Sequence, residues 1–185
     1  MFNDPRSKKI VLISHCILNQ NAASDGTADY PGAFEAIINK LLEAKVGIIQ
    51  LPCPELMCLG LDRGDVKGGE REAVVENSRI REELLLDIPK KKMEALVAST
   101  IYQIEEYLKY GFEIKYIIGL NRSPSCGVET TSKDNVEVSG KGVFMQMLNE
   151  ELDRKGIEIE MVGIKTSKPA EALEAVTEIL SRFKI

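Results

Sequence analysis

Four short apolar runs recur along the 185-residue chain, and segments with helical spacing of apolar residues separate them. The runs are rich in β-branched residues and lie at 10–13, 46–51, 113–120 and 157–164. A strand that is apolar on both faces is typical of a parallel sheet, because helices cover both faces of such a sheet. The alternation predicts an α/β fold: an open, mostly parallel sheet of about four strands with helices on both faces, a three-layer arrangement of the Rossmann or flavodoxin-like kind.

The connecting segments divide into helices and loops. Apolar spacing predicts helices over 31–45, 89–111, 142–156 and 169–183, and a weaker helix over 72–86. The alternating pattern of 157–164 suggests an edge strand, and Val136 and Val138 suggest a short hairpin arm. The segment 60–71 holds four glycines and six charged residues, which predicts a mobile loop that could act as a lid. No linker is long enough to split the chain, so we expect a single α/β domain over residues 1–185.

The composition argues against several classes of partner. The net charge is −5, aromatic residues make up 5% of the chain and tryptophan is absent, so basic and stacking surfaces for nucleic acid are scarce. No apolar run reaches membrane-spanning length, and the N-terminal region does not resemble a signal peptide. We therefore expect a cytoplasmic protein that binds neither a nucleic acid duplex nor a membrane. The surface helices carry mixed charge and do not specify an oligomeric state.

Three cysteines occupy equivalent places in this predicted fold. Cys16, Cys53 and Cys126 each follow an apolar strand by a few residues. Parallel strands end at one edge of the sheet, about 4.8 Å from their neighbours, so the three thiols can converge. A single cysteine is often a small core residue, but three in equivalent places with polar neighbours favour a functional cluster. Those neighbours are His15, Asn19, Glu55, Arg122, Ser123 and Ser125.

Reduced cytoplasmic thiols can hold a metal centre or act as nucleophiles. Adding Cys58 gives four ligands for zinc, although the chain has no Cys-x-x-Cys knuckle. An iron–sulfur cubane accepts widely separated ligands, and three cysteines would leave one iron free to act as a Lewis acid. Alternatively, Cys126 could be a metal-free nucleophile activated by His15, the only histidine. The residues by themselves leave these three alternatives open.

Several short motifs resemble those of the DUF523 family, to which thiouracil desulfidases belong. The most specific is Ser123-Pro124-Ser125-Cys126-Gly127, and Gly140-Lys141-Gly142-Val143 is similar to the later G-x-G-V element of that family. Two weaker matches are Cys53-Pro54-Glu55 with Gly60, Leu61 and Arg63, similar to a C-P-E…G-L…R segment, and Cys16-Ile17-Leu18, similar to a first-strand C-L-L. The chain departs from the family in keeping only Asp25-Gly26 of an R-Y-D-G-like segment and in carrying the extra Cys58. These departures leave the substrate less determined than the cofactor.

The resemblance implies a [4Fe-4S] cluster with three cysteine ligands, Cys16, Cys53 and Cys126, and one open iron. It also implies the non-redox removal of sulfur from a thiolated small molecule such as a thionucleobase, or a related sulfur transfer. On this basis we expect Glu55 and Ser125 to be catalytic. We expect His15, Asn19 and Ser123 to bind the substrate.

Overall fold

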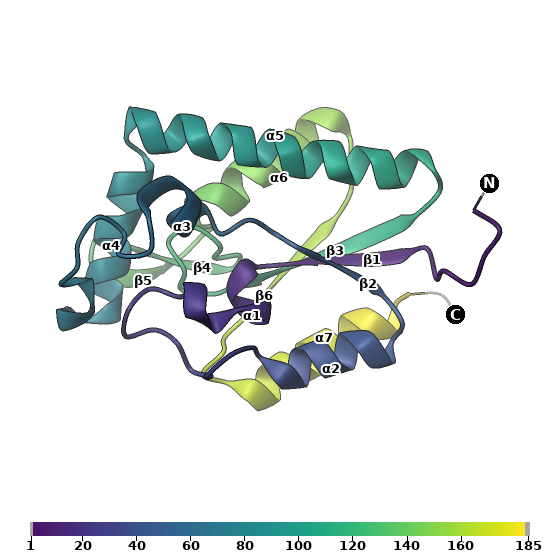
Figure 1. Cartoon of the computed structure of the whole chain (residues 1–185), viewed down its shortest axis with the longest axis horizontal. Helices are drawn as coiled ribbons and strands as arrows, with labels where there is room; N and C mark the ends of the chain where they lie inside the picture. The colour runs from purple at the N-terminus through teal and green to yellow at the C-terminus, as the bar shows by residue number, and fades with distance from the viewer. Residues whose placement is uncertain (1, 184–185) are drawn as a thin grey trace.

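The computed structural model describes residues 2–183 and contains a four-stranded parallel sheet between two layers of helices (Figure 1). The strand order is β2-β1-β3-β6, and every neighbouring pair is parallel. The predicted α/β fold class is therefore confirmed, with β6 at an edge. The strands are β1 (Lys9–Ile13), β2 (Gly47–Gln50), β3 (Glu113–Leu120) and β6 (Glu160–Ile164).

Long helices cover the two faces of the sheet, and short helices lie where the strands end. α5 and α6 pack on one face, and α2 and α7 pack on the other (Figure 1). No helix in this part of the chain, residues 2–183, is both long and apolar enough to cross a lipid bilayer. The α-helices described are α1 (His15–Leu18), α2 (Glu35–Glu43), α3 (Pro54–Leu59), α4 (Ala73–Leu84), α5 (Asp87–Lys109), α6 (Val143–Lys155) and α7 (Pro169–Ser181).

The central strands are apolar because each of their faces meets a core. Leu12 of β1 and Ile117 of β3 belong to the core under α5 and α6. Val11, Ile13 and Ile118 point the other way, into the core under α2 and α7. All five side chains are fully buried, so the continuous apolar runs of the sequence reflect burial on both faces.

A β-hairpin follows the third parallel strand, as predicted from the valines at 136 and 138. Its strands are β4 (Thr130–Lys133) and β5 (Val136–Ser139). The two turn residues, Asp134 and Asn135, have φ of 54° and 64°. This is the left-handed pair that a two-residue type I′ turn requires.

The segment before α2 differs from its prediction. α2 begins at Glu35 rather than at position 31. The residues just before it form backbone hydrogen bonds with the segment that follows β1. The Gln20 N–H donates to the Gly32 carbonyl, and the Phe34 N–H donates to the Ile17 carbonyl. The region 15–30, between the first predicted strand and the first predicted helix, contains α1 and the 3-10 helix η1 (Gln20–Ala22). These contacts between segments distant in sequence leave no signal in helical spacing.

The start of the last strand also differs. β6 begins at Glu160 rather than at 157. The Ile157 N–H donates to the Leu152 carbonyl and so closes α6, behind Gly156 in the left-handed conformation with φ of 65°. Residues 157–159 therefore connect the end of α6 to β6 rather than forming part of the strand.

Candidate functional site

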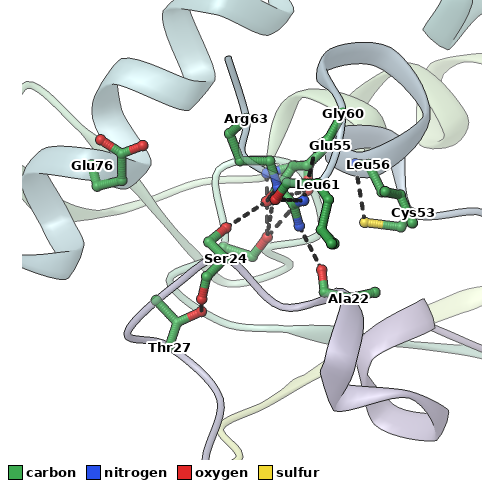
Figure 2. A network of polar contacts seen from close by, with 12 residues as sticks. Ala22, Ser24, Thr27, Cys53, Glu55, Leu56, Gly60, Leu61, Arg63 and Glu76 are labelled. Carbon is green, nitrogen blue, oxygen red and sulfur yellow. Dashed lines mark hydrogen bonds and ion pairs between the residues drawn. The ribbon is translucent and has the colours of Figure 1, made fainter. Parts of the chain in front are cut away.

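The three predicted ligand cysteines lie at the carboxyl edge of the sheet. Cys16 is the second residue of α1, which follows β1, and Cys126 lies in the loop between β3 and β4. Cys53 precedes α3 after β2, and its Sγ accepts a hydrogen bond from the Leu56 N–H at 3.5 Å (Figure 2). Because β2, β1 and β3 are neighbours, the sheet brings these cysteines to the edge where such folds bind ligands.

The three thiols perturb one another. A hydrogen bond between the Cys16 and Cys53 thiols raises the pKa of Cys16 strongly and lowers the pKa of Cys53. Burial, and after it the neighbouring charge of Cys53, raises the pKa of Cys126 to about 12. All three thiols are free, and Cys16 is less buried than the other two. Thiols that shift one another's pKa in this way lie within electrostatic reach of one another.

The donor set fits an iron–sulfur cluster better than a single metal ion. A structural zinc site takes four protein ligands, whereas a cubane with one open iron takes three. Burial and the neighbouring Cys53 raise the pKa of Cys58, the fourth thiol that a zinc site needs, but Cys16 and Cys126 do not contribute to this shift. Three soft thiolates at a polar edge are the ligands that iron–sulfur clusters take.

A buried glutamate lies beside the thiols. Glu55, in the first turn of α3, is 7% exposed and forms the centre of the network in Figure 2. One carboxylate oxygen accepts hydrogen bonds from Ser125 Oγ at 2.6 Å and Ser123 Oγ at 3.5 Å. The other accepts from Ser24 Oγ at 3.0 Å and Arg63 Nε at 3.2 Å. Ser125 Oγ is also 3.6 Å from Cys126 Sγ, so this serine connects the carboxylate to a thiol.

Arg63 supplies the positive charge that a buried carboxylate needs. Its side chain is 2% exposed. Besides Glu55, it donates to the carbonyls of Gly60, Leu61 and Ala22. The segment 60–71, predicted to be a mobile loop, is thus anchored at Arg63 to α3 and to the end of η1.

The Ser-Pro-Ser-Cys-Gly loop is held by its own serine and by the start of α6. Ser123 Oγ accepts hydrogen bonds from the N–H groups of Ser125, at 3.3 Å, and Cys126, at 2.9 Å. The Val143 N–H donates to the Pro124 carbonyl at 2.9 Å. A Cβ on Gly142 would lie 2.4 Å from the Ser125 carbonyl carbon. The second glycine of the G-x-G-V element, Gly142, is therefore needed because the loop packs directly on its backbone.

A small cavity of about 80 Å³ opens onto this network. Cys16, Glu55 and Ser123 line it, together with Arg122 and Thr166. Arg122 holds a φ of 73°, a left-handed conformation that is uncommon for residues other than glycine and is often found at functional sites. The structure thus brings Cys16, Glu55, Ser123 and Arg122 together around one opening.

Two of the residues expected to bind substrate lie elsewhere. His15 lines a separate cavity of about 330 Å³ together with Cys53, and burial lowers the pKa of its imidazole. Asn19 lines neither of these two cavities, and its side-chain oxygen accepts a hydrogen bond from the Asn21 N–H and so caps η1. Their predicted roles have less geometric support than those of Glu55, Ser123 and Ser125.

Sequence reasoning gave no role to three residues of the site. The sequence indicates Arg63 only as part of a motif, and Arg122 only as a polar neighbour of a cysteine. Ser24 carried no signal, since its bond to Glu55 joins positions 31 residues apart. The sequence indicates the Glu55–Arg63 pair only through the segment Pro52-Cys53-Pro54-Glu55 and the arginine eight residues after Glu55.

Comparisons with known proteins agree with these motifs. A family model described as 2-thiouracil desulfurase matches residues 11–159. An uncharacterized protein of Methanocaldococcus jannaschii is 30% identical over 157 residues, which cover 85% of this chain and 86% of that protein. A solved structure of a [4Fe-4S]-dependent thiouracil desulfidase is similar with a TM-score of 0.46 and 20% identity, covering 92% of this chain and 99% of that one. Since the family model spans most of its length, the chain belongs to the 2-thiouracil desulfurase family.

Proposed function

We propose that this protein is an enzyme that hydrolyses the carbon–sulfur bond of a thiolated small molecule such as a thionucleobase. In the balanced reaction, a C=S group and water give a C=O group and hydrogen sulfide, with no net oxidation or reduction. The observation that carries the proposal is the convergence of three thiols on a buried, hydrogen-bonded glutamate. Membership of the 2-thiouracil desulfurase family supports it.

Cys16, Cys53 and Cys126 would hold a [4Fe-4S] cluster in this proposal. When bound, the cluster supplies an iron without a thiolate ligand, which acts as a Lewis acid toward the substrate sulfur. The chain supplies the remaining chemistry. Glu55 is placed to accept a proton from water through Ser125 or directly, because its carboxylate borders the cavity and bonds Ser125 Oγ at 2.6 Å. Arg63 and Ser24 hold the opposite carboxylate oxygen and so fix its orientation.

The two alternatives have weaker support. A zinc module needs Cys58, and of the other three thiols only that of Cys53 affects the pKa of Cys58. A metal-free nucleophile at Cys126 needs an accessible thiolate, whereas burial raises the pKa of Cys126 to about 12. His15, its suggested activator, lines the other cavity, beside Cys53.

Anaerobic reconstitution with iron and sulfide tests the proposal. We expect about four irons and four sulfides per chain, a broad visible absorbance, and sulfide release from 2-thiouracil. Cys16→Ala, Cys53→Ala and Cys126→Ala should each lose most of the iron. Cys58→Ala is the matched control, since it removes a buried thiol outside the proposed ligand set. Stoichiometric zinc that Cys58→Ala abolishes, or iron that persists without Cys16, would reject the cluster.

A further inference from the structure

Ser14 occupies a fixed place between the first strand and the first cysteine. It directly follows β1, precedes α1, and is 1% exposed. Its N–H donates to the Ile118 carbonyl of β3 at 2.9 Å, and its carbonyl accepts from the Ile17 N–H at 3.0 Å. Both the N–H and the carbonyl of Ser14 are therefore hydrogen-bonded, and these bonds fix the position from which its side chain extends.

The side-chain hydroxyl of Ser14 is buried without a hydrogen-bond partner. Among residues 2–183, Ser14 Oγ is the one buried side-chain oxygen or nitrogen without a hydrogen-bond partner. A serine before a helix commonly caps a free N–H with its side chain, but Ser14 makes no such bond. Other buried serines have partners: Ser24 bonds Glu55, Ser78 bonds the Val74 carbonyl, and Ser132 bonds the Arg122 carbonyl. An orphaned buried hydroxyl is unfavourable, so its presence calls for a partner that the polypeptide does not supply.

The Ser14 hydroxyl lies close to two of the proposed ligand cysteines, Cys126 in space and Cys16 along the chain. Ser14 Oγ lies near enough to the Cys126 thiol to lower its pKa, against the larger effect of burial. Cys16 is two residues further along the chain. The other hydroxyl at Cys126 is that of Ser125, which is engaged by Glu55 at 2.6 Å. Ser14 is therefore the hydroxyl left free to bond sulfur.

We propose that Ser14 is a positioning residue for the iron–sulfur cluster, whose hydroxyl donates a hydrogen bond to cluster sulfur beside Cys126. The inference rests on the proposed function, since it needs the cluster to be bound. Hydrogen bonds to cluster sulfur stabilise the more negative, reduced state and so raise the reduction potential. Such outer contacts also slow the loss of metal. The Ser14 hydroxyl, which has no hydrogen-bond partner in the polypeptide alone, would then have one when the cluster is bound.

The test compares Ser14→Ala with Ser78→Ala, both with and without the cluster. Without the cluster, Ser14→Ala should leave the urea midpoint unchanged or raise it, because it removes a hydroxyl that bonds nothing. Ser78→Ala should lower that midpoint, because Ser78 Oγ donates to Val74 and accepts from the Asn135 N–H. With the cluster bound, a chelator should remove the visible absorbance of Ser14→Ala about ten-fold faster than that of the wild type. The reduction potential of the cluster in Ser14→Ala should be more negative than in the wild type. Ser78→Ala should match the wild type in both.

The outcomes separate this inference from the proposed function. A wild-type protein that takes up no iron overturns the proposed function and the role of Ser14 with it. A loaded wild type with a Ser14→Ala variant of equal cluster lifetime and potential overturns the role of Ser14 alone. A Ser14→Ala variant that is destabilised without the cluster as much as Ser78→Ala shows that the hydroxyl serves the polypeptide, and it also overturns the inference.

Discussion

Glu55 divides its two carboxylate oxygens between different partners. One oxygen faces the hydroxyls of the Ser-Pro-Ser-Cys-Gly loop, and the other faces Arg63 and Ser24. The arginine side therefore holds the carboxylate in place, while the serine side is the one directed at Cys126. This division is what a proton-transfer group needs, because one oxygen stays available to the reaction while the other fixes the geometry.

Glu55→Gln should lower kcat by about 10²–10⁴-fold, the usual contribution of general acid–base catalysis. The amide keeps the size of the side chain but cannot accept a proton from water. Loss of the ion pair also leaves the buried charge of Arg63 without a counter-ion, which costs about 3–5 kcal/mol of stability. Turnover must therefore be measured per loaded, folded chain, with iron content and the urea midpoint determined on the same sample.

Glu76→Gln is the control for this loss of stability. Glu76 is also a buried glutamate paired with arginine, but its partners are Arg71 and Arg79, and it stands apart from the Glu55 network in Figure 2. Glu76→Gln should be destabilised and should retain its turnover per folded chain. An equal loss of kcat in both variants would show that the effect at Glu55 is structural.

The sequence indicates the ligand cysteines and Glu55 more readily than their supports. Cysteines placed after strands can be recognised because strand ends follow from apolar runs. Ser24 and Arg63 reach Glu55 only after η1 and the segment 60–71 have packed against each other. Such packing joins irregular segments with no periodic pattern, so the sequence alone does not predict which polar side chain meets the carboxylate.

At the scale of elements, α6 and the cysteine loop stabilise each other. The first N–H groups of a helix have no partners within it. In α6 these groups donate to loop carbonyls: Val143 to Pro124, and both Phe144 and Met145 to Ser125. The buried side chains of Phe144 and Met145 anchor the helix start in the core, so the helix transmits the rigidity of the core to Cys126.

Gly142→Ala should therefore disturb the site through the helix. Its φ of −63° is acceptable for alanine, so the expected cost is steric. A Cβ there would lie 2.4 Å from the Ser125 carbonyl carbon and 2.8 Å from the Cys126 nitrogen, both backbone atoms that cannot rotate away. We expect a loss of about 1–3 kcal/mol in unfolding free energy and at least a halving of the iron bound per chain. Gly32→Ala, where a Cβ meets nothing within 4 Å, should change neither quantity. Full iron binding by Gly142→Ala would show that the loop is not fixed by this contact.

For the whole molecule, the fold was predictable because two periodicities repeat along the chain. Runs that are apolar on both faces predicted the central strands, and helical spacing predicted the helices that cover them. Short elements at the carboxyl edge, α1 and α3, were not predicted, because four and six residues are too few to show a period. The edge that carries the candidate site is thus also the part of the fold with the weakest sequence signal.

The acid sensitivity of the whole fold should depend on its buried ion pairs, above all on Glu76. Hydrogen bonds from Arg79 and then Arg71 hold the pKa of Glu76 below its ordinary value. A carboxyl group with a lower pKa in the folded than in the unfolded state stabilises the fold above the unfolded pKa of about 4.3. That contribution is lost as the pH falls through the folded pKa.

The urea unfolding free energies of wild type and Glu76→Gln, measured between about pH 7 and pH 3, should therefore converge at low pH. At neutral pH the variant should be less stable by about 1–3 kcal/mol, the range for hydrogen bonds to a charged group, because Arg71 and Arg79 are partly exposed and can be hydrated again. Below about pH 4.3 the difference should shrink, since protonation removes the same charge from the wild type. Glu151→Gln, which removes a partly exposed carboxylate paired with the exposed Arg154, should follow the wild type closely throughout. A difference between wild type and Glu76→Gln that stays constant to pH 3 would mean that the charge of Glu76 does not contribute to the stability of the fold.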